Sequence, residues 1–228
     1  MAHCYGRRVA VGGRWHELQC PHEPAKAVFV APVRPHDACR ADPPRAIDLP
    51  LTRSDMERAL ALTRWPHSDA DRARFHDRYI VPVDGPMVDG FSVTQVEVTT
   101  EFRRLELIGE HHARVNDLFG RGGLRDAEEA LRPWHDRLSI SAHLAFDLAK
   151  YKYITGIPSI DVVFGGPVAV APLDVRRTGI YGNDSGLIRG IVEVVFDAVS
   201  IGQTSRPVIV LWHGTELARV SIDFAQLD

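Results

Sequence analysis

Histidine and aspartate side chains that could hold a metal ion occur in two short segments near the middle of the 228-residue chain. His111 and His112 are adjacent, and His135 is followed directly by Asp136. Imidazole nitrogens and carboxylate oxygens bind divalent metals such as zinc, and a metal-bound water is a nucleophile at neutral pH. The two segments therefore suggest His112, His135 and Asp136 as catalytic ligands of a divalent metal, zinc or magnesium.

This pair of segments resembles the HD-domain phosphohydrolases, in which a histidine on one helix and a His-Asp dyad on a later helix hold a metal. The resemblance is confined to residues 111–136 and implies phosphoester hydrolysis. Two features depart from the family: Pro133 and Trp134 precede the dyad, and the chain ends in a β-rich segment whereas the family is wholly helical. Without a metal, His112 would belong to an ordinary amphipathic helix with a solvated polar face.

Two adjacent arginines, Arg176 and Arg177, begin a polar, glycine-rich segment that runs to residue 186. A guanidinium group binds phosphate or carboxylate through two parallel hydrogen bonds, and polar loops often hold ligands. We expect these arginines to bind the anionic part of a phosphoester or other small-molecule substrate. A solvated connection between strands is the alternative interpretation.

The three cysteines all lie within the first 50 residues. Cys20 and His22 form one close pair in the sequence, and His36 and Cys39 form a second. Four such ligands can enclose a tetrahedral zinc ion. This alternative site would be structural and would imply no reaction. The other interpretation is that the cysteines are reduced thiols in a proline-rich arm.

The chain carries 27 basic and 30 acidic side chains, for a net charge of −3. Nucleic-acid binding usually requires a basic surplus, so there is no strong nucleic-acid signal. Arginine outnumbers lysine by 24 to three, but the excess is spread along the chain and indicates a composition bias. No apolar run approaches the roughly 20 residues that span a bilayer, and no secretory signal is visible. We expect a cytoplasmic protein with no membrane partner.

The predicted fold class is α+β. We expect a coil-rich N-terminal arm with short strands over residues 1–50, and a main domain over 51–228. In that domain, a helical middle precedes a C-terminal antiparallel β-meander that packs against the helices. The expected helices span 54–79, 101–119 and 126–154, and the β-rich segment spans 159–225.

Local signals support these elements. Ser54 and Glu57 have the spacing of a capping box, and Gly120 is placed where a helix commonly ends. Gly165-Gly166 predicts a hairpin between apolar segments on either side. The expected meander consists of strands at 188–200, 207–213 and 217–224.

Two function hypotheses follow. The first is a metal-assisted hydrolase that acts on phosphoesters. The second is a non-catalytic binding or assembly protein, a homo-oligomer through a sheet edge, with structural zinc in the arm. The chain has no phosphate-binding loop, dinucleotide fingerprint or nucleophile elbow to decide between an enzyme and a binding protein.

Overall fold

The computed structural model describes residues 50–63, 68, 70, 73, 76–152, 156–166, 169–183, 185–202 and 205–227. The chain divides into two units, Met1–Ala41 and Asp42–Asp228, and every described residue belongs to the second. The proposed zinc ligands Cys20, His22, His36 and Cys39 therefore lie outside the described residues.

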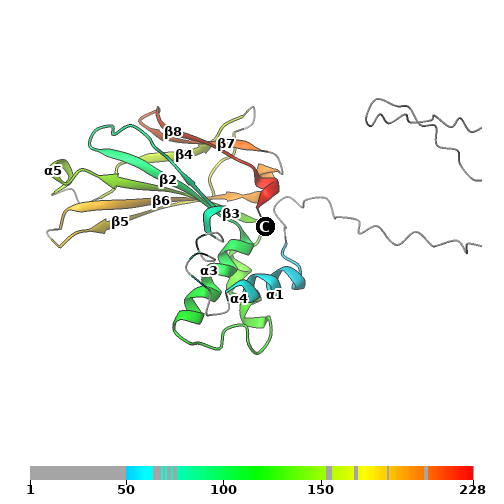
Figure 1. Ribbon diagram of the computed structural model, residues 1–228. Coiled ribbons are helices and arrows are strands. Elements are labelled where there is room, and N and C mark those ends of the chain that lie inside the picture. Colours follow the sequence, from blue (N-terminus) through cyan, green and yellow to red (C-terminus); the bar gives the residue numbers. More distant parts are fainter. Residues whose placement is uncertain are drawn as a thin grey trace, which may run out of the picture. The chain divides into compact units, whose positions relative to one another are not determined.

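Eight strands form two antiparallel sheets in the described part of the chain (Figure 1). The larger sheet has the order β1-β2-β3-β6-β5 and the smaller the order β4-β7-β8. In the larger sheet the strands are β1 (Ile80–Pro82), β2 (Phe91–Thr99), β3 (Arg137–Phe146), β6 (Leu187–Asp197) and β5 (Asp174–Tyr181). In the smaller sheet they are β4 (Ile160–Phe164), β7 (Arg206–Trp212) and β8 (Thr215–Ile222).

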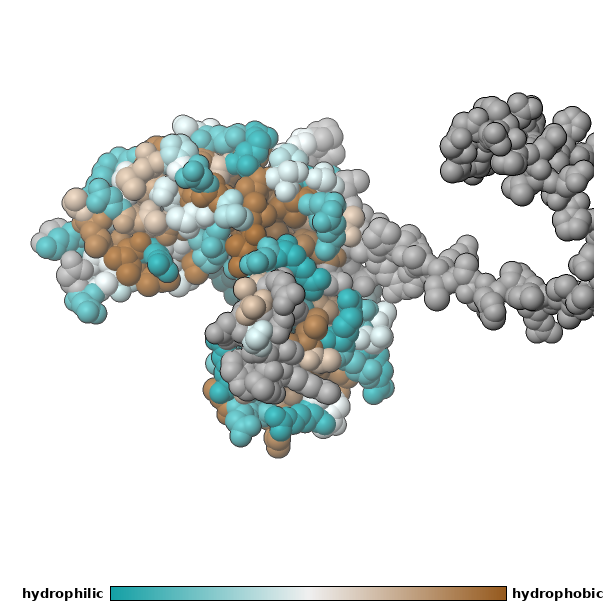
Figure 2. Space-filling model, in the orientation of Figure 1, coloured by the Kyte–Doolittle hydropathy of each residue, from teal (hydrophilic) through white to brown (hydrophobic). Residues whose placement is uncertain are grey.

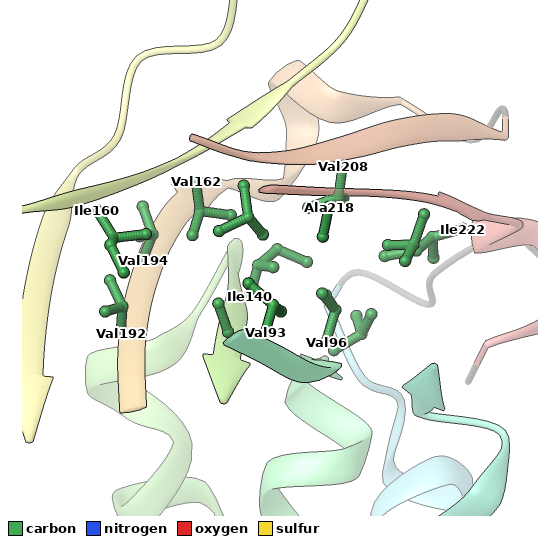
Figure 3. Packing of buried hydrophobic residues seen from close by; sticks show 14 of the residues in the cluster. Val93, Val96, Ile140, Ile160, Val162, Val192, Val194, Val208, Ala218 and Ile222 are labelled. Carbon is green, nitrogen blue, oxygen red and sulfur yellow. The ribbon is translucent and has the colours of Figure 1, made fainter. Parts of the chain in front are cut away.

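The main hydrophobic core lies between the two sheets (Figure 3). Val93, Ile140 and Val194 from the five-stranded sheet belong to the same buried cluster as Val162 and Val208 from the three-stranded sheet. Side chains alternate between the two faces of a strand, so one face of each sheet supplies this core. The opposite face of the five-stranded sheet is free to carry polar groups.

A second hydrophobic cluster holds the helices together. It joins α1 (Arg53–Leu62), α3 (Glu101–Arg114) and α4 (Arg125–Leu131), which lie on one side of the five-stranded sheet (Figure 1). Phe102 and Leu105 of α3 are its fully buried centre. Short elements complete the described fold: α5 (Leu148–Tyr151), α6 (Ala198–Ile201), and the 3₁₀ turns Arg132–Trp134 and Phe224–Gln226.

The expected α+β class is confirmed at the level of mixed helices and antiparallel sheets. The N-cap of helix α1 is Thr52, two residues before the predicted cap, Ser54. The Thr52 hydroxyl accepts a hydrogen bond from the Asp55 backbone N–H (3.2 Å), and the Asp55 carboxylate accepts one from the Thr52 N–H (3.0 Å). Thr52 and Asp55 therefore form the capping box that was expected from Ser54 and Glu57.

The helix predicted over 101–119 is confirmed only as far as Arg114, where α3 ends. Asn116 has a φ of 56°, which no helix tolerates in its interior. The left-handed residue ends the helix before Gly120, where the sequence had suggested the stop.

The helix predicted over 126–154 is wrong between residues 135 and 147, whereas Arg125–Leu131 and Leu148–Tyr151 are helical. Residues 137–146 form β3, the central strand of the larger sheet. Ile140, Ala142 and Leu144 alternate with Ser139 and Ser141 and enter the core between the sheets. This period of two outweighed the i, i+4 spacing on which the helix was predicted.

The three-strand C-terminal meander is also wrong in part. The β7–β8 hairpin is confirmed, with His213 and Gly214 at positive φ as a tight hairpin turn requires. However, β6 pairs with β3 and β5 in the other sheet. Among the described residues, no hairpin is found at Gly165-Gly166: β4 pairs with β7, and residues 169–173 belong to no strand.

Within the described part of the chain, no helix combines the length and the apolar character needed to cross a membrane.

Candidate functional site

A row of polar side chains crosses the five-stranded sheet on the face opposite the main core. The strand register aligns Glu97, Ser141, Glu193 and Arg176 on β2, β3, β6 and β5. Their neighbours along each strand, such as Ile140 and Val194, face the core. The row therefore lies on the face toward the helices, where α3 contributes its own charged residues.

Two arginines from distant parts of the chain meet at one tryptophan ring. Arg104 of α3 donates hydrogen bonds to Ser139 Oγ (2.8 Å) and to Glu193 Oε1 (3.3 Å). Its guanidinium carbon lies 3.5 Å from the centroid of the Trp134 ring, and that of Arg176 lies 5.6 Å from the same centroid. Guanidinium groups at these distances interact favourably with the π-system of an indole.

An open cavity of about 440 Å³ lies beside this cluster, along α3. We call it the Trp134 pocket. The residues that line it are Arg104, Leu107, Ile108, His111, His112 and Trp134. Burial lowers the pKa of the Arg104 guanidinium, Glu193 raises it in part, and the positive charge of Arg176 lowers it further. Arg104 is therefore a partly buried cation that is paired with Glu193 and lies near the positive charge of Arg176.

A buried ionic network fixes α3 on the sheet next to this pocket. Arg103, with a side chain only 2% exposed, has its guanidinium 3.6 Å from Glu106 Oε2 and 3.9 Å from Glu97 Oε1. Arg103 also donates a hydrogen bond to His76 Nδ1, and His143 Nε2 lies 3.3 Å from Glu97 Oε2. The hydrogen bond with His143 lowers the pKa of Glu97, against the opposing effect of burial, and Arg103 lowers it further.

The His-Asp dyad of the predicted metal site lies in the turn before β3. His135 is half-exposed, with Nδ1 3.4 Å from Oε2 of the buried Glu101, and the Asp136 backbone N–H donates to Glu101 Oε1 (2.6 Å). Asp136 has a φ of 57°, which fits a turn and not the helix of the resemblance. The structure thus joins the dyad to a carboxylate that the sequence had not suggested.

His112 lies at the other end of α3. Its Nδ1 is 2.8 Å from Asp117 Oδ2, and its ring stacks on Phe119. Glu101 and His112 are eleven positions apart in one helix, or about 16 Å along the helix axis. The structure therefore does not bring His112 together with His135 and Asp136 as ligands of one ion.

Among the described residues, no group of three or more His, Cys, Asp and Glu side chains lies close enough to hold a metal ion. A divalent metal stays a prediction, as does the structural zinc site of the N-terminal arm.

Arg176 and Arg177 do not act together. Residues 174–181 form strand β5 and not the predicted loop, so the two side chains point to opposite faces of the sheet. Arg177 donates to the carbonyl oxygen of Ile160 (3.3 Å), whereas Arg176 lies at Trp134. Of the predicted substrate-binding pair, Arg176 lies beside Trp134, which lines the Trp134 pocket.

The buried Glu101 carboxyl group predicts a pH dependence of stability. Burial raises its pKa, although hydrogen bonds from Asp136 and His135 lower it in part. A raised folded-state pKa means that the contribution of Glu101 is largest below its unfolded pKa and is lost as pH rises through the folded value. Glu101→Gln is therefore expected to remove this loss, measured as the free energy of unfolding in urea between about pH 4 and pH 7.

Glu129→Gln is the control for that measurement, because the Glu129 side chain is 53% exposed and pairs with Arg125 on the surface of α4. It should keep the pH dependence of the unmodified protein. An identical pH dependence in Glu101→Gln would show that burial of Glu101 has no such effect.

The chain matches no protein-family model, no curated protein and no solved structure. The fold and the site define its class directly. It is an α+β protein with two antiparallel sheets packed face to face, and it has a pocket along α3 that is lined by both charged and apolar side chains.

Proposed function

We propose that the protein is a binding protein for a small anionic molecule with a flat, apolar portion, and that this molecule occupies the Trp134 pocket. The observation that carries the proposal is the placement of the Arg104 and Arg176 guanidinium groups 3.5 and 5.6 Å from the centroid of one indole ring. Paired guanidinium groups are the preferred partners of carboxylate and phosphate.

The charges around the pocket support an anionic ligand. Arg104 is held in place by Ser139 and Glu193, so it is oriented before a ligand arrives. Arg176 donates through Nε to Asp174 (2.8 Å), and its guanidinium carries two further nitrogens on a half-exposed side chain. A ligand anion would therefore meet one fixed and one adjustable guanidinium.

The other residues of the Trp134 pocket indicate the chemistry of the uncharged part of the ligand. Leu107, Ile108 and Trp134 provide apolar surface beside the charged groups. A cavity of about 440 Å³ is within the usual range for small-molecule sites, and apolar walls with a few polar groups are typical of them. An aromatic carboxylate or a phosphate monoester of a flat group matches this combination.

Isothermal titration calorimetry with phenyl phosphate and benzoate tests the proposal. Inorganic phosphate and the neutral benzyl alcohol separate the anionic from the apolar contribution. We expect Arg104→Ala and Trp134→Leu each to weaken binding of phenyl phosphate by about 10- to 100-fold, and Arg176→Ala by about tenfold.

Arg177→Ala is the matched control for these variants, because Arg177 lies on the other face of the same strand. It should leave the affinity unchanged. Unchanged affinity in Arg104→Ala and Trp134→Leu, or no binding by the unmodified protein, would contradict the proposal.

A metal-assisted phosphoester hydrolase is the second candidate. The observation that favours it is the half-exposed His135 ring beside the buried Glu101 carboxylate, since a histidine oriented by a carboxylate can act as a general base. A measurement of bound metal distinguishes the hydrolase from the binding protein. Elemental analysis of the full chain should find a stoichiometric metal that His135→Ala removes.

The same measurement distinguishes the structural zinc. Cys20→Ser or Cys39→Ser should remove a zinc ion bound in the N-terminal arm and leave a catalytic metal in place. A chain purified without any bound metal would contradict both the hydrolase and the structural zinc site.

A further inference from the structure

The protein partners of Arg104 determine which of its N–H groups a ligand can reach. Nη2 of Arg104 donates to Ser139 Oγ (2.8 Å) and to Glu193 Oε1 (3.3 Å), so both of its hydrogens have acceptors. Nη2 belongs to both pairs of parallel donors in a guanidinium group, the pair with Nε and the pair with Nη1. Arg104 can therefore offer a ligand single N–H groups from Nε or Nη1, but no complete fork of two parallel donors.

Arg176 has the opposite arrangement. Its Nε donates to Asp174 Oδ2 (2.8 Å), and within the described part of the chain its side chain makes no other hydrogen bond. The two terminal nitrogens, Nη1 and Nη2, thus form an intact fork on a half-exposed side chain. Such a fork binds two oxygen atoms of one anion through parallel hydrogen bonds.

The strand register brings the two arginines to the same place. Arg176 is the register partner of Glu193, which accepts a hydrogen bond from Arg104. Both guanidinium groups also lie beside the Trp134 ring. An anion bound between them would meet the fork of Arg176 and a single N–H of Arg104, which together supply three donors.

We propose that the Trp134 pocket selects an anion with three terminal oxygens, the phosphoryl group of a phosphate monoester or a phosphonate, over a carboxylate. Two of the oxygens bind the Arg176 fork and the third accepts a hydrogen bond from Arg104. A carboxylate has two oxygens, and the fork uses both of them. The choice of anion rests on the proposed function, because it concerns the ligand of the same pocket.

The apolar part of the ligand contributes less to this selectivity. Figure 2 shows hydrophobic residues at the surface of both the sheets and the helices, and Leu118 and Ile180 are among the exposed apolar side chains. Apolar surface is therefore not confined to the pocket. Probes that share one phenyl ring isolate the contribution of the anionic group.

Isothermal titration calorimetry of the full chain with phenylphosphonate, benzenesulfonate and benzoate tests the choice of anion. All three probes carry the anionic group directly on the ring, and benzenesulfonate combines three oxygens with the single charge of benzoate. We expect phenylphosphonate to bind at least about tenfold more tightly than benzoate, as one additional charge-assisted hydrogen bond requires.

Two variants assign the oxygens to the arginines. Arg104→Ala should weaken phenylphosphonate and benzenesulfonate by about tenfold and benzoate by less than about threefold, because benzoate has no third oxygen. Arg176→Lys keeps the positive charge but removes the fork, so it should weaken all three probes by about tenfold. Arg177→Ala is the matched control and should leave every affinity unchanged, because Arg177 lies on the other face of β5. Circular dichroism confirms that each variant is folded.

The outcomes separate the choice of anion from the proposed function. Equal losses of benzoate and benzenesulfonate affinity in Arg104→Ala would show that Arg104 acts by charge alone. That result, or benzoate affinity equal to that of phenylphosphonate, would overturn the selection of three oxygens and leave an anion-binding pocket in place. An unmodified chain that binds none of the three probes would contradict the proposed function as well.

Discussion

Replacing Arg103 with methionine is expected to lower the free energy of unfolding by about 3–5 kcal/mol, which is the cost of breaking a buried ion pair on one side. The Arg103 side chain is 2% exposed and the Glu106 side chain is fully buried, so removing the cation leaves buried carboxylates without it. Urea denaturation followed by circular dichroism measures the change.

The position of Arg103 explains why the effect should be large. Its guanidinium lies between Glu106 on its own helix and Glu97 on β2, so it joins α3 to the sheet. A buried carboxylate that has lost its cation destabilises the folded state, because a low-dielectric surrounding disfavours the charged form. We expect the helix layer to loosen from the sheet before the main core unfolds.

Two further variants make this prediction specific. Arg53→Met removes an arginine whose pair with Glu57 is largely exposed, and it should change stability by less than about 0.5 kcal/mol. The double variant Arg103→Met with Glu106→Leu should recover part of the loss, because apolar side chains can replace a buried ion pair. Equal stability of Arg103→Met and Arg53→Met would contradict an energetic role for the network.

The sequence predicted those elements of secondary structure that depend on nearby residues alone. The apolar face of α3 contains Phe102 and Leu105, and the β7–β8 hairpin has the residue pattern of a tight turn. Strand β3 was missed because Leu144, Leu148 and Tyr151 have a helical spacing, although only Leu144 belongs to β3 and Leu148 is exposed. Only the partner strands β2 and β6 select the extended form, and their pairing is not encoded near residue 140.

The candidate site was predicted only in part for the same reason. Arg176 was identified from its chemistry, and His112 lines the Trp134 pocket although it was expected to bind a metal. Arg104 and Trp134 were missed, because they come from α3 and from the turn after α4 and are brought together only by the sheet register. A short motif cannot report a site assembled from three distant segments.

The aromatic cluster that joins the two sheets predicts the other large effect. Phe91→Ala is expected to lower the free energy of unfolding by about 3–5 kcal/mol, because the side chain is fully buried and its removal leaves a cavity. The Phe91 ring lies 5.9 Å from Phe146, 6.2 Å from Tyr151 and 5.4 Å from Trp212, measured between ring centroids.

These contacts join side chains of both sheets and of α5. Phe91 and Phe146 are paired across β2 and β3, and Tyr151 belongs to α5, whereas Trp212 belongs to β7 of the other sheet. Edge-to-face contacts such as that with Trp212 add to the energy of burial. Loss of the ring should therefore weaken the packing of one sheet on the other, visible as a reduced near-ultraviolet dichroism of the aromatic residues.

Two comparisons separate this effect from a general sensitivity to mutation. Phe91→Leu retains most of the buried volume and should cost less than about 1.5 kcal/mol. Leu118→Ala, at a side chain that is 67% exposed, should change stability by less than about 0.5 kcal/mol. If Phe91→Ala were no more destabilising than Leu118→Ala, the two sheets would have to be held together by the remaining valines and isoleucines of the core, and not by the aromatic cluster.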